Sequence, residues 1–204
     1  CSLGGSAWTR GHVLLNLLDQ VANRVEELHV DAATGGWTRR AVALPGPGTL
    51  GIGALHEPHL PDDPLAEHYW VTYADFLTPD SLMLAEAGRD APEVPKQRPR
   101  YFDADGLVAE QRFATSADGT RVPYFVVRPK DAPMDGSTPT LLYGYGGFEV
   151  SLQPWYSGGF GLAWYERGGA LAVANIRGGG EFGPAWHQAA VGEHKPRSHE
   201  DFIA

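Results

Sequence analysis

Short apolar runs separated by turn residues occupy the first half of the chain, and their pattern predicts β-strands. Leu14, Leu15 and Leu18 keep a helical spacing, so periodicity alone also allows a helix in this segment. Strands are favoured because the next residues alternate between apolar and polar and then meet the turn Thr34-Gly35-Gly36. The expected strands are residues 12–18, 25–30, 37–44, 49–56, 69–76 and 81–85. Short strands at this close spacing predict antiparallel sheets, as in a sandwich or a propeller.

The pattern changes after residues 88–105, which are rich in proline and charge. We interpret this stretch as a linker, because proline stiffens it and few apolar residues drive its burial. A domain boundary is therefore expected near Pro99, which divides the chain into residues 1–99 and 100–204.

Strands and helices alternate in the second half. A hairpin is expected around Asp118-Gly119, between strands at residues 108–115 and 122–128. Further expected elements are a strand at 140–145, a helix at 159–167, a strand at 170–176, a helix at 184–191 and a helix starting at Glu200. This alternation predicts a parallel sheet with helices on its faces.

Two of the expected strands run into glycine clusters. One leads into Tyr143-Gly144-Tyr145-Gly146-Gly147-Phe148 and the other into Arg177-Gly178-Gly179-Gly180-Glu181-Phe182-Gly183. We expect the two strand ends to lie side by side. Glycine clusters often serve backbone geometry alone, so the chemical interest rests on Tyr145, whose hydroxyl can donate a hydrogen bond to a substrate.

These motifs, followed by Trp186-His187 and preceded by Ser116-Ala117-Asp118-Gly119-Thr120-Arg121-Val122-Pro123, resemble the prolyl oligopeptidase family of serine peptidases. The resemblance implies the last strands of a β-propeller at residues 1–99. It also implies the N-terminal part of an α/β-hydrolase peptidase domain at residues 100–204. The family implies cleavage of short peptides after proline by acyl transfer, with the propeller screening out folded substrates.

The resemblance also assigns two site residues. Tyr145 matches the tyrosine whose hydroxyl helps to hold the developing oxyanion, and Phe148 matches a residue that lines the pocket for the substrate proline. The chain departs from the family at Arg197-Ser198-His199, where an asparagine and an apolar or aromatic residue are more usual. This departure puts the local helix packing in question.

The sequence contains no nucleophile elbow of the form Gly-x-Ser-x-Gly. Serine hydrolases of this fold carry their triad in the order serine, acid, histidine. The triad is therefore expected beyond Ala204, in the rest of the parent chain. The 204 residues are expected to be a fragment that is inactive alone and prone to aggregate, because a partial sheet exposes an edge.

Two other classes of function remain open. Residues 178–183 satisfy the pattern G-x-G-x-x-G, with Asp201 about twenty residues further on, as in NAD-binding oxidoreductases. Against this reading, Glu181 would place a carboxylate beside a pyrophosphate, and Pro184 starts the helix only after the last glycine. The second alternative is a non-catalytic propeller that serves as an interaction module.

Other polar residues near the glycine clusters have less specific patterns. Arg177 and Glu181 are expected either to pair or to be two solvated charges. His187, His194 and His199 match no zinc-binding spacing and are interpreted as packing or solvated residues, so no metal and no cofactor is expected.

Charge and composition restrict the classes of binding partner and the cellular location that are expected. The formal net charge of −9 includes no basic stripe, which argues against nucleic acid. No apolar run approaches the roughly 20 residues that span a bilayer, and no signal-peptide pattern is present. Cys1 is the single cysteine, so no internal disulfide forms. These features favour a cytoplasmic location, with a periplasmic one as the alternative.

Overall fold

The computed structural model describes residues 2–90 and 92–204, so Cys1 lies outside the described residues. The chain divides into two compact units that meet between Arg98 and Pro99. The boundary that the sequence places near Pro99 falls at this division. Each unit is described by itself.

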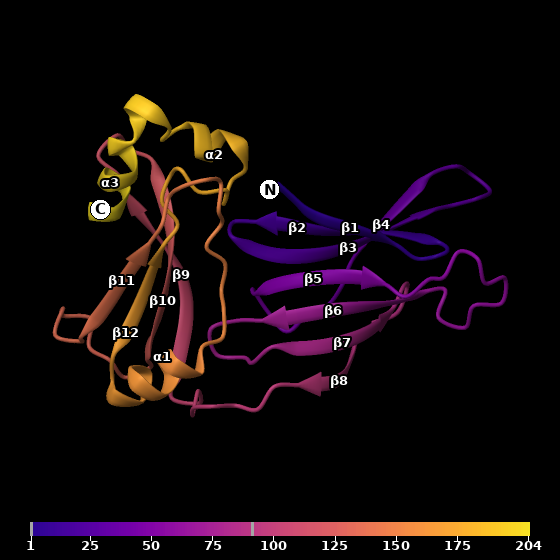
Figure 1. Ribbon diagram of the computed structural model, residues 1–204, viewed down its shortest axis with the longest axis horizontal. Coiled ribbons are helices and arrows are strands. Elements are labelled where there is room, and N and C mark those ends of the chain that lie inside the picture. The colour runs from indigo at the N-terminus through magenta and orange to yellow at the C-terminus, as the bar shows by residue number, and fades with distance from the viewer. Residues whose placement is uncertain (1, 91) are drawn as a thin grey trace. The chain divides into compact units, whose positions relative to one another are not determined.

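The first unit consists of two antiparallel sheets, each made of four strands in chain order (Figure 1). The first sheet contains β1 (Ser2–Trp8), β2 (His12–Asp19), β3 (Ala22–Val30) and β4 (Trp37–Ala41). The second contains β5 (Thr49–Ala54), β6 (His68–Ala74), β7 (Ser81–Glu86) and β8 (Glu93–Gln97). The prediction of antiparallel strands is confirmed, and the helical alternative for residues 12–18 is wrong.

One apolar core joins the two sheets of this unit. Residues from six of the eight strands point into it, for example Leu14 and Val25 from the first sheet and Leu50 and Val71 from the second, whereas among the described residues β4 and β8 contribute none. The buried Asn16 side chain also donates to the carbonyl of Leu50 at 2.8 Å. The core therefore combines apolar burial with a hydrogen bond that fixes β5 against the first sheet.

Two strands of this unit were not expected from the sequence. β1 contains two glycines and little apolar character, and β8 lies inside the stretch interpreted as a linker. β8 pairs with β7 although all its residues are exposed. Since an edge strand needs only backbone partners on one side, it can contain Pro95 and leave no apolar pattern in the sequence.

The second unit contains a mixed four-stranded sheet in the order β11-β12-β10-β9. Its strands are β9 (Leu107–Thr115), β10 (Arg121–Pro129), β11 (Thr140–Gly144) and β12 (Ala170–Ala174). β9 and β10 form the expected hairpin, but β10 then pairs antiparallel with β12, and only β11 and β12 are parallel. The parallel pairing expected for the strands at residues 140–145 and 170–176 is confirmed, whereas the antiparallel pairing of β10 with β12 was not expected. Only the β11–β12 connection crosses over through a helix, and only that crossover requires parallel strands.

The helices of this unit are shorter or placed differently than expected. They are α1 (Gly158–Ala163), the 3₁₀ helix η1 (Tyr165–Arg167), α2 (Pro184–Gln188), the 3₁₀ helix η2 (Gly192–His194) and α3 (Pro196–Ile203). The single helix expected at 159–167 is interrupted at Trp164, whose indole N–H donates to the carbonyl of Ala170 at 2.7 Å. The helix expected to start at Glu200 begins instead at Pro196.

In Figure 1, α2 and α3 lie at the end of the sheet where β11 and β12 terminate, and α1 lies at the opposite end. Among residues 2–90 and 92–204, no helix has both the length and the apolar character needed to cross a bilayer. The carboxyl ends of β11 and β12, with α2 and α3 beside them, are the part of the fold that carries the candidate site.

Candidate active site

The two glycine clusters lie side by side, as expected. β11 and β12 are parallel neighbours whose last residues, Gly144 and Ala174, are paired across the ladder. We call the segment from Tyr145 to Val150 the tyrosine bend and the segment from Arg177 to Gly183 the triglycine bend. Both bends leave the sheet at the same edge, so their backbones can meet.

The triglycine bend packs against the backbone of the tyrosine bend. A Cβ atom at Gly178 would clash with the carbonyl oxygen of Gly146, and one at Gly180 would clash with that of Glu149. A Cβ atom at Gly179 would lie 2.8 Å from the carbonyl oxygen of Val150. The three glycines are therefore required by close approach of two backbones, and Gly178 additionally has a φ of +99°.

This packing does not support the dinucleotide-binding alternative. A phosphate cradle needs free backbone N–H groups and room beside the glycines. Here carbonyl oxygens of the tyrosine bend occupy the space next to Gly178, Gly179 and Gly180. An anion placed there would meet the negative ends of carbonyl dipoles.

The two residues assigned by resemblance both lie on the tyrosine bend. Tyr145 directly follows β11 and is 46% exposed, and Phe148 is 85% exposed. Phe148 and Glu149 are non-glycine residues with positive φ, at +52° and +58°. A conformation of this kind costs on the order of 1 kcal/mol or more per residue. The surrounding contacts must therefore hold the bend in place.

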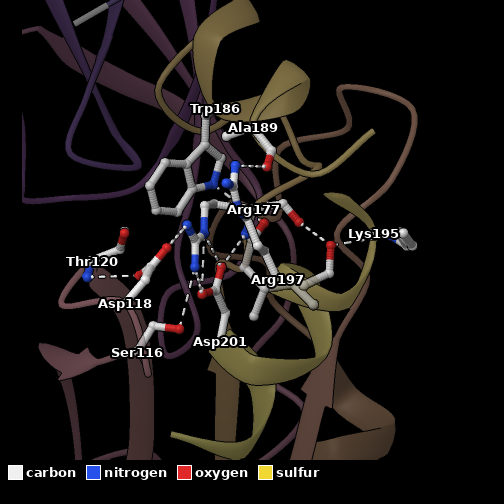
Figure 2. A network of polar contacts seen from close by, with 11 residues as sticks. Ser116, Asp118, Thr120, Arg177, Trp186, Ala189, Lys195, Arg197 and Asp201 are labelled. Atoms are coloured by element: carbon white, nitrogen blue, oxygen red, sulfur yellow. Dashed lines mark hydrogen bonds and ion pairs between the residues drawn. The ribbon is translucent and has the colours of Figure 1, made fainter. Parts of the chain in front are cut away.

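Arg177 anchors the triglycine bend through a buried network of ion pairs (Figure 2). Its side chain is 5% exposed, its Nη2 donates to Asp201 at 2.6 Å, and its Nη1 donates to Asp118 at 2.5 Å. Its backbone N–H also donates to Asp201, at 2.9 Å. These contacts join the bend to α3 and to the β9–β10 hairpin.

The charges in this network shift one another's proton affinity. The hydrogen bond from Arg177 holds the pKa of Asp118 well below its usual range, with further help from Thr120. The hydrogen bond to Asp201 raises the pKa of Arg177 despite the opposing effect of burial. The expectation that Arg177 pairs with Glu181 or is solvated is wrong on both counts.

Glu181 is also buried, at 2% exposure, but its partners are neutral. Its carboxylate accepts from the backbone N–H of Leu152 at 3.0 Å and from the Asn175 amide at 3.4 Å. Burial raises the pKa of Glu181, partly opposed by these hydrogen bonds. Glu181 therefore fixes the segment after the tyrosine bend, and it is not a solvated charge.

The histidines near the bends do not form a metal centre. His187, on α2, places Nδ1 at 2.7 Å from the carbonyl oxygen of Gly178, whereas His194 and His199 are exposed. No group of histidine, cysteine and acidic residues suited to a metal ion occurs within the part of the chain that the structure describes.

α3 supplies contacts that the sequence did not reveal. Ser198, within the stretch that departs from the family, is buried and donates to the carbonyl of Arg177 at 2.6 Å. Lys195 directly precedes α3 and donates through Nζ to the carbonyl of Gly146 at 2.5 Å. No local sequence pattern indicated that Asp201 and Asp118 belong to the site either, because their partner Arg177 is 24 and 59 residues away.

Comparison with known proteins identifies related chains. The sequence profile described as the prolyl oligopeptidase family matches residues 155–204. An uncharacterised peptidase of Sinorhizobium fredii is 42% identical over 203 residues, which are 100% of this chain and 27% of that protein. A prolyl endopeptidase of Elizabethkingia miricola is 37% identical over 166 residues, covering 81% of this chain and 22% of the relative.

Solved structures similar to this chain come from the same kind of enzyme as these relatives. A post-proline cleaving enzyme from Rickettsia typhi matches 99% of this chain with a TM-score of 0.81 and 31% identity, and 28% of that enzyme is covered. The chain therefore spans about a quarter of the length of the proteins that it matches.

Proposed function

The chain belongs to the prolyl oligopeptidase family, and from this premise we propose that it is part of a serine peptidase that cleaves short peptides after proline. The printed names of two relatives, a prolyl endopeptidase and a post-proline cleaving enzyme, support the reaction. In this proposal the chain contributes the oxyanion side of the active site.

The observation that carries the proposal is the position of Tyr145. Tyr145 directly follows the carboxyl end of β11. It lies on the tyrosine bend, whose backbone packs against the triglycine bend. The side chain is half exposed, so its hydroxyl is available to a substrate. Such a donor accelerates acyl transfer when it is held in place before charge develops on the substrate oxygen.

The attacking group must come from elsewhere in the protein. None of the serines in the sequence lies in a Gly-x-Ser-x-Gly elbow. We propose that the serine, acid and histidine belong to the remainder of a longer protein, as the greater length of the relatives supports. Phe148 would then line the pocket for the substrate proline together with residues of that remainder.

The architecture is proposed in the same way. The two antiparallel sheets of the first unit would be the last strands of a β-propeller that screens out folded substrates. The mixed sheet of the second unit would be the first part of an α/β-hydrolase sheet. β11 is at the edge of that sheet among the described residues, with Leu141 and Leu142 about half exposed. A further strand paired with β11 would cover them.

Turnover of chromogenic peptides tests the proposal. The full-length protein should cleave a peptide with proline before the scissile bond at least about 10-fold faster, in kcat/KM, than the matched alanine peptide, as expected for a shaped apolar pocket. The isolated 204-residue chain should show no turnover and should not be labelled by a serine-directed phosphonate. Turnover by the isolated chain that a substitution within it abolishes would sink the proposal, as would equal cleavage of the two peptides.

A further inference from the structure

Tyr145 is positioned by the backbone that follows it. β11 ends at Gly144, and the ring of Tyr145 is half exposed, so the strand ladder alone does not fix its direction. The next residue, Gly146, has a φ of +59° and therefore turns the chain sharply. The direction of the tyrosine depends on what holds the Gly146 peptide in this turn.

The carbonyl of Gly146 is held from two sides. Gly178 packs against it so closely that a Cβ atom there would clash with the oxygen. The Nζ atom of Lys195 donates to the same oxygen at 2.5 Å. A charge-assisted hydrogen bond of this kind is stronger and more directional than a neutral one.

Lys195 is itself anchored to the buried part of the site. Its Nζ donates to Ser198 Oγ at 3.2 Å, and Ser198 Oγ donates to the carbonyl of Arg177 at 2.6 Å. Arg177 is joined to Asp201 on the same helix, α3. A continuous set of polar contacts thus leads from the buried ion pair to Gly146, which follows Tyr145. Figure 2 shows Arg177, Asp201 and Lys195 within this set.

We propose that Lys195 is a positioning residue for Tyr145: it holds the Gly146 carbonyl so that the tyrosine hydroxyl points at the oxyanion. The inference rests on the proposed function, since it concerns the same hydroxyl. Lys195 donates to the protein backbone and does not touch the substrate. Its removal should leave substrate binding intact while the hydroxyl loses its orientation.

A mutant cycle in the full-length protein tests the coupling. Lys195→Met should lower kcat by about 10- to 100-fold with KM nearly unchanged, the size expected when a catalytic group is displaced by about 1 Å. Lys195→Arg keeps a donor and should recover most of kcat. In a Tyr145→Phe background, Lys195→Met should change kcat by less than about 2-fold, because two residues that act through one contact are not additive.

Arg197 provides the matched control. Arg197, on α3 two residues after Lys195, is also a cation that donates to a backbone carbonyl, that of Ala189, at 3.0 Å. Arg197→Met should leave kcat within about 2-fold, because Ala189 lies outside the tyrosine bend. Thermal unfolding of each variant separates a loss of folded protein from a loss of catalysis.

The outcomes distinguish the two claims. If Tyr145→Phe leaves kcat unchanged, both the proposed role of Tyr145 and this inference fail. If Tyr145→Phe lowers kcat, but Lys195→Met has no effect or the same effect in both backgrounds, the inference alone is overturned. A kcat loss that only follows a lower melting temperature, with kcat per folded molecule unchanged, also overturns it.

Discussion

The geometry of the site depends on single residues with special backbone or charge requirements. Gly178 has two backbone requirements: its φ of +99° favours glycine, and the Gly146 carbonyl oxygen leaves no room for a side chain. The triglycine run is thus explained by packing between two bends. Its match to a dinucleotide-binding pattern is a coincidence of spacing.

Replacement of Gly178 should lower the free energy of unfolding much more than replacement of a glycine whose only special feature is a positive φ. Gly178→Ala should lower the free energy of unfolding by roughly 3 kcal/mol, from overpacking and a strained φ together. Gly136→Ala is the control, because Gly136 has a φ of +83° with nothing within 4 Å of an added Cβ. It should cost only about 1 kcal/mol. Denaturant unfolding measures both, and equal losses would contradict the packing explanation.

The ion pair between Arg177 and Asp118 should make stability depend on pH. The folded-state pKa of Asp118 lies below its unfolded value, so the unfolded state binds more protons in acid. The stabilisation is fully present above the unfolded pKa, about 4, and is lost as pH falls toward the folded pKa.

In Asp118→Asn the free energy of unfolding should therefore be lower at pH 7 and should decline less steeply below pH 4 than in the unaltered protein. Unfolding curves at a series of pH values measure this slope. Identical slopes for the two proteins would show that Asp118 contributes nothing to acid sensitivity.

At the scale of elements, the strongly patterned strands could be predicted from the sequence and the weakly patterned ones could not. In β2, β6 and β7 every second residue is buried along most of the strand, and these strands are rich in apolar residues. β1 and β8 have no such pattern, since glycine, proline and charged residues are tolerated where only the backbone is paired.

Of two hairpin turns, one could be predicted from its sequence and the other could not. The β9–β10 hairpin was predictable because Asp118-Gly119 is a common turn sequence. The tight turn between β2 and β3 was not, because its two central residues are Gln20 and Val21, both with positive φ. Valine rarely adopts that conformation.

The candidate site was predictable only in part. The adjacency of the two bends followed from the glycine clusters at two strand ends. The partners of Arg177 could not be predicted, because they lie 24 and 59 residues away and no local sequence pattern indicates such a distant ion pair. The same holds for Lys195 and the Gly146 carbonyl, which are 49 residues apart.

The open edge at β11 should make the isolated chain associate with itself. Leu141, Leu142 and Tyr143 are between 42% and 48% exposed, and β11 has a strand on one side only among the described residues. Leu142→Lys should reduce association, because charge on an edge strand opposes pairing with another chain. Leu162→Lys, on α1 and 53% exposed, is the charge-matched control. Light scattering that falls equally for both variants would argue against pairing through β11.

At the scale of the whole molecule, the second unit brings four separate segments to one place. These are the β9–β10 turn, the tyrosine bend, the triglycine bend and the start of α3. The buried Arg177 network joins three of them, and the Lys195 hydrogen bond and the packing of Gly178 join the tyrosine bend to the others before any substrate arrives. Such preorganisation is what electrostatic stabilisation of a transition state requires. The chain represents about a quarter of its relatives, and the attacking serine is proposed to lie in the remainder.

The most direct test of this account is the kcat of the full-length protein with Tyr145→Phe. Loss of one oxyanion donor should lower kcat by about 100- to 1,000-fold, with KM and the melting temperature nearly unchanged because Tyr145 is half exposed and the substitution keeps its ring. An unchanged kcat would contradict the claim that this chain supplies the oxyanion donor.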